Sequence, residues 1–327
     1  MKSNPLVSVC MITYGHEAFI NKAIEGILMQ QTSFNFELII ADDCSPDNTE
    51  AVVNKLLSEH SKANQVTYIR HKENLGMYEN FLFALNACES TYIALCEGDD
   101  YWTDPKKLQR QVDFLEANLD YEVCFTNIKV VDTDDKLVKK QLIPSHRKTT
   151  FKQRHLPTWA PTLTRVFRNR DFSKAFPNVP GLDTIMLLYQ SKYGKLRLMH
   201  DITGAYRLHE GGIYSAQTTA KQKQDVIATF LACMTLADRF LYLKYFGLMF
   251  KKLFEIKSMD NSIFKENRLV VLRAYHNYKA ELSGSARFKV LLIRLILAFP
   301  YPKSSKRLNN VFLRLVDKLF IYDYLED

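Results

Sequence analysis

The sequence predicts an α/β fold in which helices cover both faces of a mostly parallel, doubly wound β-sheet. Short runs rich in β-branched residues alternate with helical stretches through the first half of the chain. This alternation is typical of parallel sheets whose strands are joined by helices. Polar and acidic residues also follow several of the apolar runs, at the strand ends where such sheets bind ligands.

Each predicted element has a local signal. The strands are short apolar runs, whereas the helices show apolar residues at helical spacing. We predict strands at Leu6–Thr13, Phe36–Asp42, Val66–His71, Tyr92–Cys96 and Glu122–Val131. We predict helices at Glu17–Gln30, Asp47–Glu59, Met77–Cys88, Pro105–Asn118 and Ile185–Tyr193.

Length and charge favour two regions. A chain of 327 residues with 47% hydrophobic content is long enough for about two domains. Residues 220–327 hold 19 Lys and Arg against 10 Asp and Glu, so this region carries the whole net charge of +8. We therefore expect an α/β domain at residues 1–219 and a basic helical region at 220–327.

The basic region has apolar helical faces at Thr229–Phe250, Phe288–Phe299 and Val311–Tyr322. Basic residues beside apolar helical faces suit an anionic membrane surface. The alternative is a helical appendage that packs on the rest of the chain or on a second copy and keeps a solvated basic side. No apolar stretch reaches the ~18 residues of a transmembrane helix.

The cysteines and the N-terminus predict a cytoplasmic protein, peripheral on the inner face of the membrane if the basic region binds lipid. Residues Met1–Pro5 run directly into the first predicted strand, which leaves no room for a signal peptide. The six Cys are scattered without a CxxC spacing, which favours reduced thiols over disulfides or zinc.

An acidic cluster, Glu97-Gly98-Asp99-Asp100, ends the apolar run Tyr92–Cys96. Crowded carboxylates repel one another and lose solvation at the end of a buried strand. Mg²⁺ or Mn²⁺ removes both penalties, because these ions take oxygen ligands and share them with substrate phosphates. The alternative is a solvated acidic turn.

Six segments together resemble glycosyltransferase family 2 enzymes of the GT-A fold, and they follow the family's order and spacing. They are VSVCMITYGHEAFI (7–20), ELIIADDCSPDNT (37–49), NLGMYENF (74–81), EGDDYWTDPKKLQRQ (97–111), GLDTIMLL (181–188) and YRLHEGGIYS (206–215). The resemblance implies a nucleotide-sugar donor, a glycan or lipid-linked acceptor, and Mn²⁺ or Mg²⁺.

The resemblance also implies roles for individual residues. Donor contacts are expected at Thr13, Tyr14, Glu17, Asp42, Asp43, Glu97, Gly98, Asp99 and Arg207. Asp43 is similar to the carboxylate that accepts a hydrogen bond from uracil or thymine, although it could instead cap the following turn. Metal ligands are expected at Asp99, Asp100 and His209, with Glu97 in a ligand or supporting role. Trp102 and Trp159 are expected on the acceptor side.

Asp183 resembles the catalytic base of the family, whose members invert the anomeric configuration. The alternative is that Asp183 caps the helix that follows it. One family feature is missing, because residues 74–80 contain no Arg near the phosphates. Arg70, Lys72 or Arg207 would have to supply that charge.

Other functional classes fit less well. A nucleotidyltransferase needs a Gly-rich phosphate loop, and a dinucleotide dehydrogenase needs G-x-G-x-x-G after a strand. Neither pattern is present, and the basic region lacks a nucleic-acid-binding motif. We therefore predict a metal-dependent, inverting transferase that adds one sugar from a UDP- or dTDP-type donor during surface-polysaccharide assembly. A catalytically degenerate glycan- or nucleotide-binding relative is the alternative.

Overall fold

The structure is a computed structural model that describes residues 4–172, 176–212 and 217–285, together with 287, 289–291 and 314. The chain forms two compact units. The first contains residues 1–153, 158–176 and 190–216, and the second contains 154–157, 177–189 and 217–327. Two short segments before residue 219 thus belong to the second unit, unlike in the predicted division.

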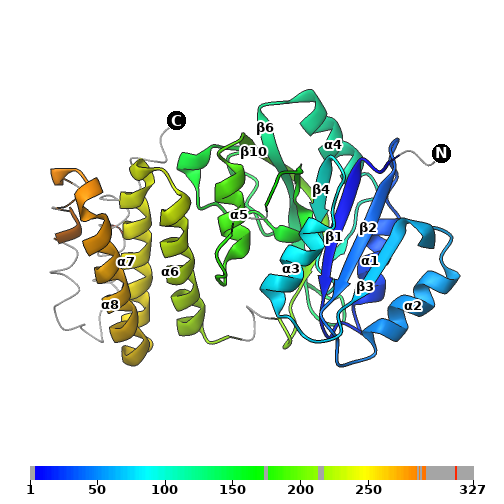
Figure 1. Cartoon of the computed structure of the whole chain (residues 1–327), viewed down its shortest axis with the longest axis horizontal. Coiled ribbons are helices and arrows are strands. Elements are labelled where there is room, and N and C mark those ends of the chain that lie inside the picture. The colour runs from blue at the N-terminus through cyan, green and yellow to red at the C-terminus, as the bar shows by residue number, and fades with distance from the viewer. Residues whose placement is uncertain are drawn as a thin grey trace. The chain divides into compact units, whose positions relative to one another are not determined.

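The first unit is built on a mixed, mostly parallel β-sheet (Figure 1). Its strand order is β3-β2-β1-β4-β9-β6-β10-β5, with β7 paired to β6 and β8 paired to β10. The five predicted strands are β1 (Val7–Thr13), β2 (Phe36–Asp42), β3 (Val66–Arg70), β4 (Tyr92–Leu95) and β6 (Tyr121–Val131). The others are β5 (Tyr101–Trp102), β7 (Leu137–Lys139), β8 (Thr150–Phe151), β9 (Val166–Arg168) and β10 (Lys195–Arg207).

Parallel pairing joins β3, β2, β1 and β4, and also joins β6 to β10. β9 runs antiparallel between β4 and β6, and β5, β7 and β8 also pair antiparallel. The parallel strands end at one edge of the sheet. The predicted mostly parallel α/β fold is therefore confirmed.

Four predicted helices connect the strands of the first unit. They are α1 (Ile20–Leu28), α2 (Thr49–Glu59), α3 (Met77–Asn86) and α4 (Lys107–Ala117). Alternate side chains of β1 serve the two faces of the sheet. Val9 and Met11 pack in one apolar cluster with Ile24 of α1, whereas Cys10 contacts Cys88 just after α3.

The second unit is helical. It contains α5 (Leu182–Gln190), α6 (Thr219–Leu236), α7 (Tyr242–Lys257) and α8 (Asn261–Tyr278). Short 3₁₀ turns lie at Ala63–Gln65, Gln153–His155, Thr162–Thr164, Arg239–Leu241 and Lys279–Glu281. Caps fix two of the long helices, because Thr218 accepts from Lys221 N and Asp260 accepts from the amides of Ser262 and Ile263.

The C-terminal region is helical as predicted, but its first apolar face is not continuous. The predicted face Thr229–Phe250 is interrupted between α6 and α7. Most apolar residues of α7 are buried within the second unit, including Phe246 and Phe250. The predicted faces Phe288–Phe299 and Val311–Tyr322 lie almost wholly outside the described residues. Among the described helices, none has the length and hydropathy needed to cross a bilayer.

Candidate active site

The carboxyl ends of β1 and β4 approach each other closely. The amide of Gly98 donates to Ile12 O at 3.0 Å, which extends the pairing of the two strands beyond β4. A Cβ atom on Gly98 would lie 2.7 Å from Thr13 Oγ1 and 2.9 Å from Ile20 Cδ1. Only glycine fits here without displacing the end of β1, and this close approach places Asp99 beside the loop that follows β1.

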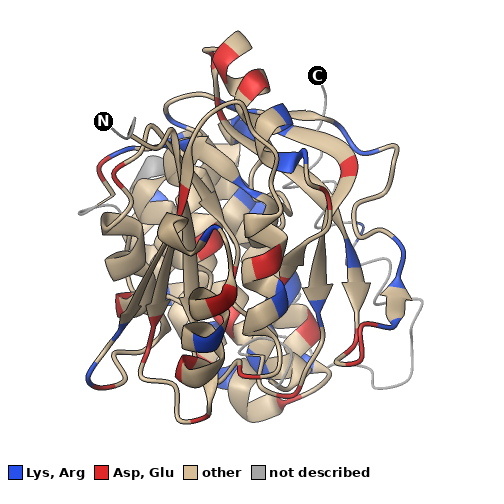
Figure 2. Cartoon of the chain, turned by 90° about the vertical axis from the view of Figure 1, so that its right-hand side faces the viewer, with Lys and Arg blue, Asp and Glu red and all other residues tan. Residues whose placement is uncertain are grey.

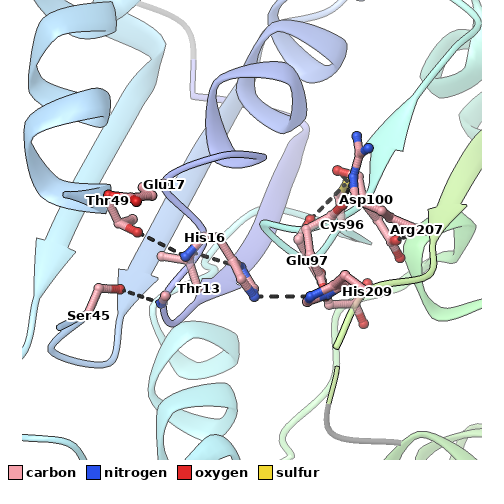
Figure 3. Close-up of polar contacts among 12 residues, drawn as sticks. Thr13, His16, Glu17, Ser45, Thr49, Cys96, Glu97, Asp100, Arg207 and His209 are labelled. Atoms are coloured by element: carbon pink, nitrogen blue, oxygen red, sulfur yellow. Dashed lines mark hydrogen bonds and ion pairs between the residues drawn. The ribbon is translucent and has the colours of Figure 1, made fainter. Parts of the chain in front are cut away.

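Three potential metal ligands meet at this edge of the sheet. The carboxylate of Asp99 lies between two imidazoles, with Oδ2 3.0 Å from His209 Nε2 and 3.8 Å from His16 Nε2. One ligand atom from each residue lies within 4.8 Å of the other two. Figure 3 shows the rings of His16 and His209 pointing toward one another from different segments. We call His16, Asp99 and His209 the ligand cluster.

Local hydrogen bonds hold His16 in this position. Its Nδ1 lies 3.1 Å from the hydroxyl of buried Thr13 (Figure 3), which leaves Nε2 facing Asp99. Its amide donates to Thr49 Oγ1 at 3.0 Å. The preceding Gly15 has φ +70°, a conformation that glycine adopts easily, and its amide donates to Ser45 Oγ. The turn at Gly15 and His16 is therefore held by hydrogen bonds to Ser45 and Thr49.

His209 follows β10 and packs against the loop after β1. Its ring centroid lies 5.0 Å from that of Phe19. The neighbouring guanidinium of Arg207 lies over the same Phe19 ring at 4.7 Å. Phe19 thus links the segment after β10 to the start of α1.

The electrostatics favour a neutral imidazole beside an ionised carboxylate. Burial lowers the pKa of His16, and the charge of His209 adds to this effect against the opposing charge of Asp99. Burial acts to raise the pKa of Asp99, but the hydrogen bond with His209 and the charges of both histidines outweigh it and lower that pKa. A neutral imidazole and a carboxylate are the protonation states that bind metal ions.

The ligand cluster fits a divalent cation. Two imidazole nitrogens and one carboxylate oxygen can occupy three positions and leave the rest of the coordination shell for oxygens of a donor. Carboxylate and water suit Mg²⁺ and Mn²⁺, whereas imidazole suits transition metals. The two histidines therefore favour Mn²⁺ over Mg²⁺. His209 and Asp99, both predicted metal ligands, lie within hydrogen-bond distance of each other.

His16 was not predicted from the sequence. It lies between Tyr14 and Glu17, which the family resemblance did select. The available signal was its position just after the first strand, at the edge that carries the acidic cluster. The pairing with His209 depends on contacts between distant segments, which spacing along the chain does not reveal.

Asp100, which is also a predicted metal ligand, contacts the backbone of β10. Its carboxylate is buried and accepts a hydrogen bond from Arg207 N at 2.8 Å. Burial raises its pKa well above the usual value, and the charges of Asp99 and Glu97 raise it further. Asp100 therefore connects the acidic turn to β10.

Arg207, which is a predicted contact to the donor diphosphate, links three segments of the first unit. Its guanidinium is buried and forms an ion pair with Asp135 at 2.9 Å. The same group donates to the backbone oxygens of Asp99, Asp132 and Thr133. Its hydrogen-bonding groups are thus committed to holding three segments together.

Asp42 and Asp43 both organise backbone near the predicted nucleotide site. Asp42 is fully buried and accepts from Ser45 and from Tyr68 Oη, which corrects its predicted contact with the donor. Asp43 accepts from the amides of Leu75 and Gly76 at 2.6 and 2.9 Å. A carboxylate has lone pairs for further donors, so Asp43 keeps its place as a candidate for base recognition.

The remaining predicted donor residues lie around the ligand cluster. Tyr14 is exposed directly before the Gly15 turn. Glu17 is exposed and accepts from Asn48 N at 2.8 Å, which ties the loop after β1 to α2. Glu97 is half-buried beside Gly98. Of the cations considered for the phosphates, Arg70 donates to Ser45 O, whereas Lys72 is exposed.

The two tryptophans have opposite environments. Trp102 is buried, its Nε1 donates to Leu163 O at 2.6 Å, and it belongs to the core, which corrects its predicted acceptor-side role. Trp159 is 52% exposed. It lines a groove of about 310 Å³ with Leu142, Ile143, Pro144 and Arg147.

Trp159 belongs to the segment that leads into β9. This strand runs antiparallel to β4, and Arg165 O accepts from Leu95 N at the carboxyl end of β4. The segment that contains Trp159 therefore reaches β9 at that end of β4.

Asp183 lies in the first turn of α5 and is exposed. It belongs to the second unit, so it is not among the residues that meet in the first. Gly181 before it packs on α6, because its amide donates to Thr229 Oγ1 and a Cβ there would lie 2.5 Å from Thr229. The position of Asp183 at the helix start is thus well defined within its unit.

Comparison with known proteins identifies relatives of this chain. A family model described as glycosyl transferase family 2 matches residues 8–176, more than half of the chain. An uncharacterised protein of Mycobacterium tuberculosis is 31% identical over 221 residues, which are 66% of this chain and 63% of the relative. The UDP-Glc:α-D-GlcNAc-diphosphoundecaprenol β-1,3-glucosyltransferase WfaP of Escherichia coli is 32% identical over 112 residues, 34% of this chain and 42% of WfaP.

Solved structures share the fold. TarS 1–349 of S. aureus, in complex with UDP-GlcNAc, has a TM-score of 0.62 at 16% identity and covers 95% of this chain and 90% of its own. A mannosyltransferase from Pyrobaculum calidifontis, in complex with GDP-Man and Mn²⁺, has a TM-score of 0.55 at 14% identity, with coverage of 98% and 88%. With the family match, these likenesses show that the chain belongs to glycosyltransferase family 2 and has the GT-A fold.

Proposed function

We propose that this protein is a metal-dependent, inverting glycosyltransferase that moves one sugar from a UDP- or dTDP-type donor to a hydroxyl of a glycan or lipid-linked acceptor. The observation that carries the proposal is the ligand cluster at the carboxyl edge of a GT-A sheet. Parallel α/β sheets bind ligands at this edge.

The ligand cluster would hold Mn²⁺ in preference to Mg²⁺. A bound divalent cation neutralises charge on a departing nucleoside diphosphate. Thr13 orients His16 for binding through Nε2, and the close packing of Gly98 on Thr13 places Asp99 beside His16. Tyr14, Asp43 and Glu97 are the proposed contacts to the nucleotide.

Asp183 is the proposed catalytic base. Its carboxylate would take the proton from the acceptor hydroxyl while the acceptor oxygen bonds to the anomeric carbon. The bond from that carbon to the diphosphate oxygen breaks, and its electron pair leaves with the nucleoside diphosphate. Attack from the face opposite the leaving group inverts the anomeric configuration.

The acceptor is proposed to be a surface-glycan intermediate. The name of WfaP, which specifies a diphosphoundecaprenol-linked acceptor, supports a lipid-linked substrate. The exposed ring of Trp159 beside its groove offers an apolar face on which a sugar can stack. This placement keeps the predicted acceptor-side role of Trp159 as part of the proposal.

The basic C-terminal region is proposed to help the enzyme reach such an acceptor at an anionic membrane. Residues 220–291 contain 13 Lys and Arg against 6 Asp and Glu, so most of the positive charge lies on or near α6–α8. Self-association through these helices is the alternative.

The test adds UDP or dTDP, each with Mn²⁺, to the wild type and to three variants. Thermal unfolding measures the binding. Asp99→Ala and His16→Ala should each remove the Mn²⁺-dependent nucleotide response. Asp183→Asn should keep this response and lower turnover by about 10²-fold or more, as loss of a general base usually does. Asp113→Ala, on the exposed side of α4, is the matched control for a lost carboxylate.

The outcomes separate the functional alternatives. Full activity in excess EDTA would exclude metal dependence. Metal-dependent nucleotide binding without turnover of any donor sugar would favour a degenerate binding relative. An Asp183→Asn variant with wild-type turnover would leave Asp183 as a helix-capping residue.

A further inference from the structure

A short hairpin on the first unit exposes two aliphatic side chains. After β6 the chain turns at residues 132–135 and returns as β7. Leu137 and Val138 are 60% and 56% exposed, because among the described strands β7 pairs with β6 alone. Neighbouring residues on a strand point to opposite faces, so neither face of β7 is covered.

The turn of this hairpin carries Asp132, Asp134 and Asp135, whereas the chain after the turn is basic. No Asp or Glu occurs from Lys136 to Arg170, whereas ten Lys and Arg do. Lys139 and Lys140 are exposed, and no described acidic group lies within ion-pair distance of either. Figure 2 colours Lys and Arg blue and Asp and Glu red. We call Leu137, Val138, Lys139, Lys140 and exposed Arg147 the hairpin surface.

The hairpin surface lies beside the segment that carries His209. Leu137 pairs with Val131 at the carboxyl end of β6. Val131 O in turn accepts from Leu208 N at 2.9 Å, and the guanidinium of Arg207 holds the backbone of the hairpin turn. The chain after β7 continues to Leu142 and Ile143 in the wall of the Trp159 groove.

We infer that the hairpin surface docks the first unit on an anionic lipid bilayer. Exposed aliphatic groups enter the interface between headgroups and acyl chains, and Lys or Arg beside them attract anionic headgroups. Charge complementarity selects this occupant, because the surface combines exposed cations with uncovered apolar groups. Docking would turn the carboxyl edge of the sheet toward the bilayer.

A second explanation for Lys139 and Lys140 predicts a different result in a vesicle-binding experiment. Lysines on an edge strand can simply prevent pairing with other strands. In that case the surface would protect against aggregation and would show no preference for anionic lipid.

Co-sedimentation of the full chain with vesicles tests the inference. Phosphatidylglycerol vesicles provide the anionic surface, phosphatidylcholine vesicles the neutral one, and each is used at low and high salt. The test variant is Leu137→Ser with Lys139→Glu. The control variant is Leu119→Ser with Lys192→Glu, which makes the same chemical changes at exposed sites near the amino ends of β6 and β10.

The wild type should bind phosphatidylglycerol vesicles at low salt and leave them at high salt. The test variant should bind about tenfold more weakly or worse, since each Lys near an anionic surface contributes substantially to attraction. The control variant should bind within about twofold of the wild type. Equal binding of the two variants would overturn the inference, as would a wild type that binds neutral vesicles equally well.

Docking does not require catalysis. The docking inference and the proposed function can therefore be tested separately. Metal-dependent nucleotide binding, measured on the same samples, should be the same in both variants. Loss of vesicle binding with nucleotide binding retained supports the inference. Vesicle binding without any nucleotide response would count against the proposed function alone.

Discussion

Asp99 and Asp100 are neighbours in the chain, yet their surroundings favour opposite protonation states. Histidines on two sides lower the pKa of Asp99, whereas burial and the nearby carboxylates raise the pKa of Asp100. The doublet can therefore place one negative charge at the ligand cluster without placing two like charges together. Asp99 thus lies beside the two histidines, whereas Asp100 accepts the hydrogen bond that links the acidic turn to β10.

Lys107 is a second residue whose surroundings set its charge. Its side chain is fully buried, and Nζ lies 3.9 Å from the centroid of the Trp102 ring. Nζ has no hydrogen-bond partner among the described residues. Burial lowers the pKa of Lys107 from 10.5 to about 7. Such a shift corresponds to an unfavourable free energy on the order of 3–5 kcal/mol for burying the cation.

We predict that Lys107→Met raises the free energy of unfolding at pH 7 by about 1–4 kcal/mol, because the apolar side chain needs no charge in the core. Below pH 7 the folded chain of the wild type also binds the proton on Lys107, so it must hold the buried cation. Between pH 7 and 10.5 only the unfolded chain binds the proton, so the wild type gains stability as pH rises. Urea unfolding at pH 7 and pH 9.5 should show that the variant exceeds the wild type in free energy of unfolding by less at pH 9.5. An unchanged difference would mean that Lys107 is not neutral in the folded chain.

At the scale of elements, α1 and β5 approach so closely that backbone meets backbone. A Cβ on Gly26 of α1 would lie 2.8 Å from Trp102 O and 3.0 Å from Trp102 N. Neither atom can move without disturbing the pairing of β5 with β10. This contact fixes the position of the chain that leaves the acidic turn.

We predict that Gly26→Ala lowers the free energy of unfolding by about 1–3 kcal/mol, despite the better helix propensity of alanine, because overpacking shifts β5. Asn21→Ala, on the exposed side of the same helix, is the control and should stay within about 0.5 kcal/mol of the wild type. Chemical denaturation measures both. If the two variants behave alike, the packing of α1 on β5 is looser than the structure shows.

The main elements of the first unit could be predicted because apolar periodicity determines them locally. The strand Phe36–Asp42 has the predicted bounds, and the helices differ from prediction by only a few residues at their ends. β5 was missed, because a two-residue strand has too little local pattern. Trp102 was predicted on the acceptor side, but it is buried in β5, which pairs with Gly204 and Ala205.

The site could be predicted only in outline. Acidic residues at strand ends indicate the correct edge, since that rule depends on topology alone. The role of each side chain in the site depends on partners that lie far away in the sequence. Arg207 and Asp42 carry charges that suit a ligand, but the fold uses them to hold backbone segments. His16 becomes part of the cluster only when the segment after β10 reaches it.

At the scale of the whole molecule, the two units divide the proposed tasks. His16, Asp99 and His209 all lie in the first unit, whereas Asp183 and α6–α8 lie in the second. Metal and nucleotide binding are therefore proposed to depend on the first unit, and turnover is proposed to need Asp183 of the second unit as well. The net positive charge lies in the second unit, which holds 20 Lys and Arg against 11 Asp and Glu, whereas the first unit holds 24 against 25.

We predict that removal of residues 292–327 leaves Mn²⁺-dependent nucleotide binding within about twofold of the full chain. The reason is that the three residues of the cluster, and the partners that the structure describes for them, lie before this segment. Titration calorimetry on both chains measures the effect. A lost response in a truncated chain that remains folded would mean that the C-terminal segment helps to form the nucleotide site.

The ligand cluster also has a consequence for the chain as a polymer. Asp99 and His209 are separated by 110 residues, and His16 comes from the first strand–helix connection. An ion held by all three would act as a removable crosslink that closes two long loops. A crosslink around about 100 residues restricts the unfolded chain by an amount worth roughly 4–5 kcal/mol in the chain-entropy model. Chelation would open both loops together, so the first turn of the sheet and the segment after its last long strand would loosen as one.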